Sequence, residues 1–472
     1  MPEEKMAYKL VVFLLLISVV LISVNGFPHG PAWLGELRVE VAIWPLIMAN
    51  IATIYMLLLR RFYLPNSAIT YGLMALLIFI CISFVVNYSG IQIHFFKGRN
   101  GLEKFFLQFV QLVFMCLTTV AVFNVLNKIK ESERRLDWVQ WAVLSSLVIP
   151  VAYSGFIEIP ALLGVDIATQ LHRGISPFFQ EGVYPRRLRS VSGESSYFGG
   201  YIALAFPWLV AASLEKGKWL GWGLFVYPLV VLMCYLSYSR TVYGVVLGEA
   251  MLFLIALWIL KRRSMGSNAW WRFLGGNFIA IALIMSVSLI SFEARSVHDS
   301  QSVHDSPIYI GVADYAESND TRSSSSLAAI KMGVDHWLFG VGFGQYGFHS
   351  QKYLPEWLPS NGELQKLISD IPGSQWPPVY NIFARLIAET GIFGLMSWLA
   401  IWGMTLVGAI RVAISPGGDN SKGAALIVTV LGVFAIGLGF DSFRYIPYWL
   451  AIGVVAAFSM NMAGHGNASK SS

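Results

Sequence analysis

Three arginines and one carboxylate crowd a short segment in the first half of the chain. This segment reads Tyr-Pro-Arg-Arg-Leu-Arg-Ser-Val-Ser-Gly-Glu-Ser-Ser-Tyr-Phe-Gly from Tyr184 to Gly199. Arginine presents a rigid fork of N–H donors that can hold two anionic oxygens at once, and a carboxylate can accept a proton from a hydroxyl. Arg187, Arg189 and Glu194 are therefore candidates for a site that binds an anion and moves a proton.

The composition of the whole chain is that of a membrane protein. Hydrophobic residue types make up 56% of the 472 residues and charged types only 13%, far from the composition of an ordinary soluble domain. The net charge of +6 does not indicate nucleic-acid binding, because the basic residues form short clusters between apolar runs. The three cysteines also lie inside apolar runs, so neither a disulfide nor a metal cluster is indicated.

Apolar runs of the length needed to cross a bilayer recur along the chain. A membrane-spanning helix requires roughly 20 mostly apolar residues, since its backbone must satisfy its own hydrogen bonds where water is absent. We therefore predict an all-α fold, a polytopic membrane bundle of about 12 transmembrane helices. The predicted spans cover approximately residues 8–24, 39–59, 69–87, 105–127, 138–157, 197–214, 219–237, 242–260, 273–292, 381–410, 423–440 and 445–463.

The Lys and Arg clusters between these runs set the predicted orientation. Positive charge near a span resists translocation, and every cluster falls on one side of the membrane if both termini are cytoplasmic. The clusters are Lys5 and Lys9, Arg60 and Arg61, residues 128–135, Lys216 and Lys218, residues 261–272, and Arg411 and Lys422.

Two long polar segments, 158–196 and 293–380, then emerge together on the outer face. They divide the chain into three blocks of membrane helices, at 1–157, 197–292 and 381–472, the last ending in a short cytoplasmic tail. Loops of this length in a compact protein are commonly functional, so we expect the chemistry there. In the second segment we expect short helices around Ser324–Trp337 and Glu363–Asp370.

Several short motifs in these regions resemble a known family. Arg187-Leu-Arg-Ser and the following Gly-Glu-Ser-Ser-Tyr-Phe-Gly are similar to the Arg-x-Arg-Ser and Glu-Pro-Ser-Tyr motifs of bacterial polysaccharide polymerases in the O-antigen polymerase and ligase family. Ser195 stands where that family often has proline. Further matches follow in the expected order: Ser239-Arg-Thr241, His336-Trp-Leu-Phe-Gly-Val-Gly-Phe-Gly344, and Asn381 with Glu389-Thr-Gly-Ile-Phe-Gly394. The resemblance covers roughly residues 186–394.

This resemblance implies a membrane glycosyltransferase of the C-type architecture. Such an enzyme transfers a glycan from a polyprenyl diphosphate to a hydroxyl on the outer face of the bacterial inner membrane, without a nucleotide sugar, a cofactor or a metal. The implied partners are a lipid-diphosphate-linked glycan donor and acceptor and membrane lipid, with chain-length regulators or flippases as further candidates, and no nucleic acid. We expect the polymerase reaction, with the ligase as the alternative.

The resemblance also assigns roles to individual residues. Guanidinium groups can neutralise the charge that develops on a departing diphosphate, and so replace Mg²⁺. Arg322 is included because the family carries an arginine ahead of its Gly-x-Gly-x-Gly segment. The predicted diphosphate-binding residues are Arg187, Arg189, Arg240, Arg322 and Asn381, and the predicted catalytic residues are Glu194, Arg189, Arg322 and Tyr380.

The general base stays open at this point. Glu194 is the first candidate, although an acidic group at that place also suits the N-terminus of the following helix. Family ligases carry a histidine where this chain has Tyr380, and a tyrosine with an unperturbed pKa of about 10 is a poor base near neutral pH. Because Tyr380 replaces the histidine of the ligases, the sequence favours a polymerase over a ligase. His336 and His349 are the alternative bases.

Three further signals favour other interpretations. Glu249 lies inside a predicted span, where a carboxylate is costly, and it supports a rival function as a proton-coupled transporter or flippase of an anionic glycolipid. The Gly-x-Gly-x-x-Gly run from Gly342 follows no strand, so we interpret it as a turn and not as a nucleotide site. Arg385 and Glu389 are four residues apart on one helix face, and we expect them to neutralise each other.

Overall fold

The computed structural model describes residues 2–179, 187–215, 217–260, 267–298, 307–355, 362–415 and 419–468. Arg186, Lys216 and the first part of the basic cluster at 261–272 lie outside these residues. The first half of the chain forms α1 (Pro2–Leu21), α2 (Ile43–Leu58), α3 (Ala68–Val86), α4 (Tyr88–Ile93), α5 (Gly101–Asn127), α6 (Ser132–Ser146), α7 (Val148–Tyr153), α8 (Ile159–Leu162), α9 (Asp166–Ile175) and α10 (Ser195–Leu214).

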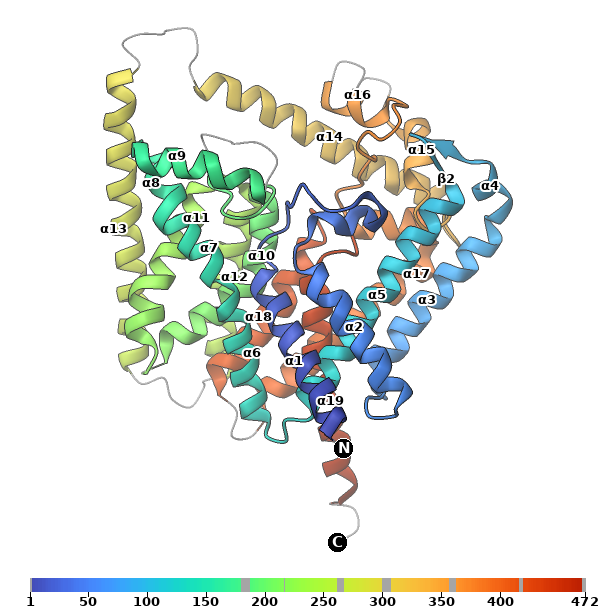
Figure 1. Cartoon of the computed structure of the whole chain (residues 1–472), viewed down its shortest axis with the longest axis horizontal. Helices are drawn as coiled ribbons and strands as arrows, with labels where there is room; N and C mark the ends of the chain where they lie inside the picture. The colour runs from blue at the N-terminus through green and yellow to red at the C-terminus, as the bar shows by residue number, and fades with distance from the viewer. Residues whose placement is uncertain are drawn as a thin grey trace.

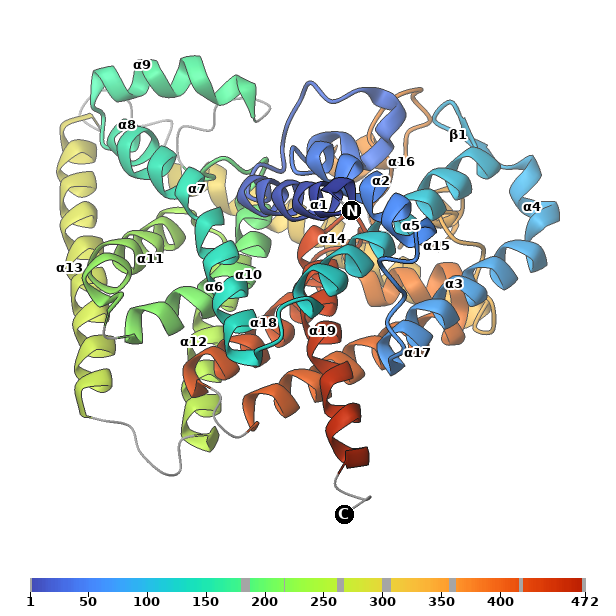
Figure 2. The ribbon, with the colours of Figure 1, turned by 60° about the horizontal axis from the view of Figure 1, so that its bottom comes forward.

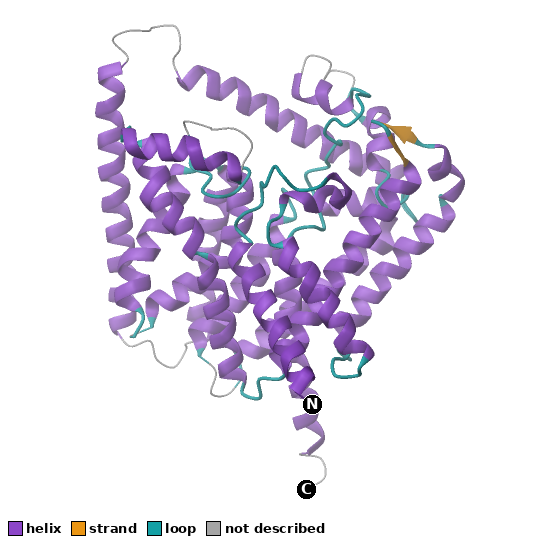
Figure 3. Cartoon of the chain, viewed as in Figure 1, coloured by secondary structure: helices purple, strands orange, loops and turns teal. Residues whose placement is uncertain are grey.

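The second half of the chain is also helical. It forms α11 (Tyr227–Leu236), α12 (Arg240–Leu260), α13 (Ser267–His298), α14 (Pro307–Asp335), α15 (Tyr346–Tyr353), α16 (Gly362–Ile368), α17 (Ile382–Ala413), α18 (Asn420–Ile436) and α19 (Ile446–Ala468). Short irregular helices are η1 (Ala32–Val39), η2 (Ser154–Glu158), η3 (Ser176–Phe178) and η4 (Trp219–Val226). Figure 3 shows how completely helices dominate, since the strands β1 (Phe95–Phe96) and β2 (Arg99–Asn100) form one small antiparallel hairpin.

The predicted spans all coincide with helices. Six helical runs among the described residues are long and apolar enough to cross a membrane, namely α3, α5, the continuous run Ser132–Leu162, α10, α12 and α17. Five shorter apolar helices accompany them, at Ile43–Leu58, Gly221–Leu236, Trp271–Val287, Asn420–Ile436 and Ile446–Phe458. The multi-pass helical class is thereby confirmed, and the total of about 12 spans stays a prediction.

The bundle has two different ends. Both termini lie at one end, and α9, α14, α15 and α16 from the two long polar segments lie at the other (Figure 1). Figure 2 places α13 and α3 at opposite edges, with α10, α18 and α19 between them. The apolar side chains of α10, including Phe206 and Trp208, are almost completely buried, so this helix forms part of the centre of the core. Which end faces the cytoplasm stays a prediction.

The second polar segment is more helical than we expected. The predicted helix near Ser324–Trp337 belongs to the much longer α14, which starts at Pro307, and α15 was not predicted. The predicted helix at Glu363–Asp370 agrees with α16. Proline is well tolerated in the first turn of a helix, because the N–H that it lacks has no partner there.

Packing against a membrane helix explains why the second half of α14 is ordered. Ala328, Ala329 and Met332 are completely buried and share a small core with Ala384 and Ala388 of α17. Small side chains let two helices approach closely. This contact holds α14 beside the start of α17. It thereby also positions the side chains of α14 that point away from α17.

Candidate functional site

A large cavity opens at the end of the bundle formed by the two polar segments. Its volume is about 1510 Å³, and its lining comes from α5, α10, α12, α14 and α17 together with the connections near them. Residues more than 200 positions apart in the chain meet there. The predicted site residues that line it are Arg187, Arg189, Glu194, Arg240, Arg322 and Tyr380.

Residues 187–194, which carry Arg187, Arg189 and Glu194, form a largely buried segment before α10 that we call the ribbon. Leu188 and Ser190 are completely inaccessible to solvent. The backbone N–H of Leu188 donates to the carbonyl of Leu236 at the end of α11, over 3.0 Å. This contact ties the ribbon to the short connection that leads to Arg240.

Two further contacts fix the ribbon from other sides. The N–H of Gly193 donates to the side-chain oxygen of Asn25 over 3.1 Å. The carboxylate of Glu158 accepts the N–H groups of Arg189 and Ser190 over 2.8 and 2.9 Å. The main chain is thus held at several points, and the side chains that reach the cavity start from defined positions.

We refer to Arg187, Arg189, Arg240 and Arg322 as the motif arginines, and the last three each contact at least one neutral group. Arg189 donates to the carbonyl of Gly193 over 2.8 Å. Arg240 donates to the side-chain oxygen of Asn319 over 2.6 Å, and the guanidinium of Arg322 lies 5.0 Å from the ring centre of Tyr380. Such contacts orient a guanidinium while leaving its positive charge uncompensated by them.

Glu194 stands at the N-terminal end of α10. Its side chain makes no capping hydrogen bond, is exposed and lines the cavity, and it accepts the hydroxyl of Ser196 over 3.0 Å. A carboxylate there still interacts favourably with the helix dipole. The accessible position of Glu194 is compatible with proton transfer as well.

Asn381 differs from the other predicted residues. Its side-chain oxygen caps α17 by accepting the N–H groups of Phe383 and Ala384, each over 3.0 Å. It does not line the cavity, whereas Tyr380 beside it does and has the unusual positive φ of 61°. The observed contacts of Asn381 are therefore those of a helix cap.

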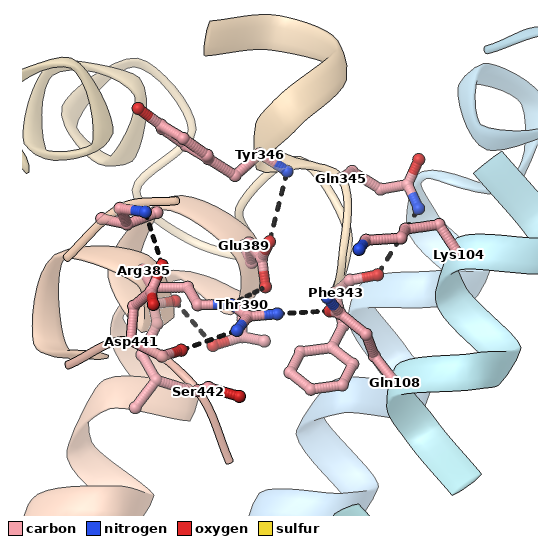
Figure 4. Close-up of polar contacts among 12 residues, drawn as sticks. Lys104, Gln108, Phe343, Gln345, Tyr346, Arg385, Glu389, Thr390, Asp441 and Ser442 are labelled. Carbon is pink, nitrogen blue, oxygen red and sulfur yellow. Dashed lines mark hydrogen bonds and ion pairs between the residues drawn. The ribbon is translucent and has the colours of Figure 1, made fainter. Parts of the chain in front are cut away.

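A second group of cations lines the same cavity, and Figure 4 shows two of them, Lys104 and Arg385, with the carboxylate of Glu389. Arg385 contacts Glu389 over 3.0 Å, which confirms the predicted pair. The same guanidinium donates to the carbonyl of Asp441 over 2.6 Å and to the side chain of Gln108. Glu389 also accepts the N–H of Tyr346 over 3.2 Å, so this pair ties α17 to the second polar segment.

A second part of this group comes from elements near the N-terminus and the C-terminus. The ammonium group of Lys104 lies 3.5 Å from Glu36, and the backbone carbonyl of Glu36 accepts from Arg444 over 3.1 Å. Arg444 also lies 3.6 Å from Glu40. We refer to Arg385 with Glu389, and Lys104 and Arg444 with Glu36 and Glu40, as the ion-paired cluster.

The pKa values of Glu36 and Glu40, two carboxyls of the ion-paired cluster, are shifted in opposite directions. Burial raises the pKa of Glu36, but Lys104, Arg385 and Arg444 outweigh burial and hold its pKa at about 2. Burial dominates for Glu40 and raises its pKa to about 7, although Arg444 opposes the change. The number of cations around each carboxyl accounts for the difference.

Sequence reasoning missed most of the ion-paired cluster. A signal was present, because Lys104 and Arg444 lie at the end of the bundle opposite the termini, against the distribution of basic residues that fixed the predicted orientation. On a face that is predicted to be translocated, basic residues need a partner or a ligand. The further basic residues that line the cavity without having been predicted are Arg38, Lys97 and Arg99.

The glycine-rich motif of the second segment packs against a kink in α17. The N–H groups of Val341 and Gly342 donate to the carbonyls of Ala388 and Glu389 over 2.9 and 3.0 Å. Gly340 has a φ of 66°, and a Cβ atom there would lie 2.3 Å from the backbone of Glu389. The run from Gly342 is a turn, as predicted, because Gly342 and Gly344 also have positive φ angles.

The remaining alternatives lie away from the cavity. His336 and His349 do not line it, and burial lowers the pKa of His349 to about 4. Glu249 is buried in α12 beside Gly432 of α18, and neither of its oxygens has a hydrogen-bond partner among the described residues. It does not line the cavity either. The described residues contain no group of three metal-ligating side chains, and independence from metals stays a prediction.

The fold and the cavity together define a multi-pass membrane protein whose two polar segments help to build a basic site. A family model described as O-antigen ligase matches residues 223–399. This match confirms the resemblance to the O-antigen polymerase and ligase family and points to glycan processing at a membrane. It includes Arg240, Arg322 and Tyr380, whereas Arg187, Arg189 and Glu194 precede it. No curated protein matches the chain.

Proposed function

We propose that this protein polymerises lipid-linked oligosaccharide repeat units on the outer face of the bacterial cytoplasmic membrane. The observation that carries the proposal is the meeting of motif arginines from α12, α14 and the ribbon before α10 in one cavity of about 1510 Å³. Guanidinium groups from separate elements suit a ligand with several anionic oxygens, such as a diphosphate. The family match supports a glycan as the transferred group.

The proposed reaction is an inverting displacement. The acceptor hydroxyl oxygen bonds to the anomeric carbon of the donor sugar, and the bond from that carbon to the diphosphate oxygen breaks with its electron pair. The motif arginines stabilise the charge that develops on the diphosphate. Glu194 takes the proton of the acceptor hydroxyl, a step that typically contributes about 10²- to 10⁴-fold.

Tyr380 favours polymerisation over ligation. It lines the cavity at the position where the ligases that this chain resembles have histidine, and Arg322 lies against its ring. A tyrosine can donate a hydrogen bond to a phosphate oxygen but is a weak base near neutral pH. The polymerase therefore depends on a carboxylate for proton transfer, which is the role that we propose for Glu194.

Purified full-length protein, incubated with the lipid-diphosphate-linked repeat unit of its host, tests this proposal. A ladder of products on a gel is expected. Transfer of one glycan to added lipid core, without a ladder, would instead identify a ligase. Movement of the lipid across vesicles without a new glycosidic bond would support the transporter and overturn the polymerase.

The same assay tests the need for a metal ion. We expect EDTA to leave the ladder unchanged, because the motif arginines supply the positive charge that a divalent cation would otherwise provide. Loss of the ladder with EDTA, restored by Mg²⁺ or Mn²⁺, would contradict a metal-independent mechanism.

A further inference from the structure

We propose that Glu158 is a positioning residue that holds Arg189 in the geometry needed to bind the diphosphate. This inference rests on the proposed function and names a residue that the family motifs do not include. Glu158 ends the π-helical turn η2, before α8, and only 2% of its surface is exposed. Burying a carboxyl group removes its hydrogen bonds to water. This costs free energy unless protein hydrogen bonds or an opposite charge replace them.

Three donors converge on the two oxygens of this carboxylate. One oxygen accepts the N–H of Arg189 over 2.8 Å. The other accepts the N–H of Ser190 over 2.9 Å and the hydroxyl of Ser154 over 3.0 Å. Both oxygens of the side chain therefore act as hydrogen-bond acceptors, which a carboxyl group allows and an amide of the same size does not.

The two backbone N–H groups belong to a turn that needs support. Ser190 has a positive φ of 56°, a conformation that residues other than glycine rarely adopt. The N–H groups of Arg189 and of Ser190 itself donate to one carboxylate, which supports this conformation. Ser190 is also fixed by its hydroxyl, which donates to the carbonyl of Pro150 in α7 over 3.3 Å.

The bend determines where the Arg189 side chain begins. Leu188 and Val191 are buried on either side of it, while Arg189 lines the cavity and donates to Gly193. If the bend relaxed, the guanidinium would start from a different place and direction. Arginine binds a diphosphate through a planar fork, so a displacement of about 1 Å at its base weakens the match.

Glu158 comes from a helical run separate from both α10 and α12. The run Ser132–Leu162 crosses the bundle beside α10, and η2 interrupts its regular α-helical pattern where Glu158 lies. A π-helical turn shifts the directions of the side chains that follow it and is often found at functional sites. This irregularity places the carboxylate under the ribbon.

The Glu158→Gln variant removes one of the two acceptors without changing the size of the side chain. An amide has one oxygen, so either Arg189 or Ser190 then faces an NH₂ group that can only donate. The effect on diphosphate binding should pass through Arg189. It should therefore be absent when Arg189 has already been truncated to alanine.

The test measures binding of undecaprenyl diphosphate and of undecaprenol to the purified full-length protein in detergent. We expect Glu158→Gln to weaken binding of the diphosphate about tenfold and to leave binding of undecaprenol unchanged. In the Arg189→Ala background, Glu158→Gln should have no further effect. The control variant is Glu215→Gln, because Glu215 is ion-paired with Lys218 beyond the far end of α10 and does not line the cavity.

The outcomes separate this inference from the proposed function. If the wild-type protein does not prefer undecaprenyl diphosphate to undecaprenol, the proposed function fails and the inference fails with it. If Arg189→Ala weakens diphosphate binding but Glu158→Gln does not, only the role of Glu158 is overturned. An equal loss from Glu158→Gln in both backgrounds would also overturn it, because the effect would not pass through Arg189.

A milder variant covers the case in which Glu158→Gln does not fold. Ser154→Ala removes one hydrogen bond from the carboxyl group of Glu158 and leaves the group itself in place. We expect a two- to threefold loss of diphosphate affinity that disappears in the Arg189→Ala background. Unchanged affinity in Ser154→Ala would then overturn the inference.

Discussion

Two groups of cations face the same cavity and are held in different ways. In the ion-paired cluster, Arg385 lies 3.0 Å from Glu389 and Lys104 lies 3.5 Å from Glu36. Among the motif arginines, Arg240 contacts the neutral Asn319 and Arg322 contacts the ring of Tyr380. The first group pairs its cations with protein carboxylates, whereas these contacts of Arg240 and Arg322 are with groups that carry no charge.

This contrast assigns different consequences to similar substitutions. Removing a charge from the ion-paired cluster leaves its partner buried and uncompensated, so the protein should lose stability. Changing a motif arginine should weaken transfer and leave the fold intact.

Replacing Arg189 or Arg322 by lysine should reduce glycan elongation by at least about 100-fold. Lysine keeps the charge but loses the fork that binds two oxygens together, and the loss of one aligned donor commonly costs about this much. The ladder assay with equal amounts of purified protein provides the measurement. Arg173→Lys in α9 is the matched control, since Arg173 is exposed and does not line the cavity.

Insertion and abundance of the lysine variants should match the wild-type protein. Unchanged product length in both variants would remove the motif arginines from the mechanism. If the lysine variants lost folded protein, Arg189 and Arg322 would contribute to stability as the ion-paired cluster does. That result would contradict the different roles proposed for the two groups of cations.

Glu389→Gln should destabilise the protein by about 3–5 kcal/mol, because it leaves the buried guanidinium of Arg385 without its carboxylate. Unfolding in detergent, followed by intrinsic fluorescence, measures the change. The double variant Arg385→Gln with Glu389→Gln should lose less stability than Glu389→Gln alone, since no buried charge is left over. A double variant that is at least as unstable as the single variant would contradict an electrostatic origin.

Glu36→Gln should cost stability in a pH-dependent way. The pKa of Glu36 is held at about 2, below its ordinary value of 4.5, so the folded protein favours the ionised carboxylate. That contribution is complete above about pH 4.5 and disappears as the pH falls toward 2, at up to about 3 kcal/mol before solvent screening. Unfolding of both proteins at pH 7, 5 and 3 should show curves that converge on acidification. A constant difference would show that the carboxylate charge is not responsible.

Asn381→Ala should have the smallest effect, a loss of about 1 kcal/mol of stability from the missing helix cap. Asn381→Ser restores an oxygen that can cap the helix and should recover the stability. Transfer by both variants should stay within about threefold of the wild-type rate. A tenfold loss of transfer in Asn381→Ser would instead group Asn381 with the motif arginines, as the resemblance to the family implies.

Much of the fold and part of the site could be predicted from local sequence. Apolar runs indicate membrane helices because the requirement for internal backbone hydrogen bonds acts on each segment by itself. The arginines and Glu194 were recognisable as motifs near the ends of such runs. The predicted pair of Arg385 and Glu389 was accessible for the same reason, since both residues lie on one helix.

The rest depends on contacts between distant segments. Glu36 follows α1, Lys104 lies in α5, and Arg444 follows α18. These three residues meet only when the chain has folded. The extent of α14 depends on its packing against α17, because the serine-rich run after Arg322 has only a moderate preference for helix. Neither result follows from periodicity or local composition.

The backbone contact between the glycine-rich turn and the kink of α17 makes these two stretches an inseparable pair. At Gly391 a Cβ atom would lie 2.3 Å from the carbonyl oxygen of Leu338, just as one at Gly340 would meet Glu389. A chimaera that imports residues 336–345 from a relative must import residues 385–392 with them. We expect a graft of the turn alone to mismatch the backbone of α17 and to displace the helix that carries Arg385.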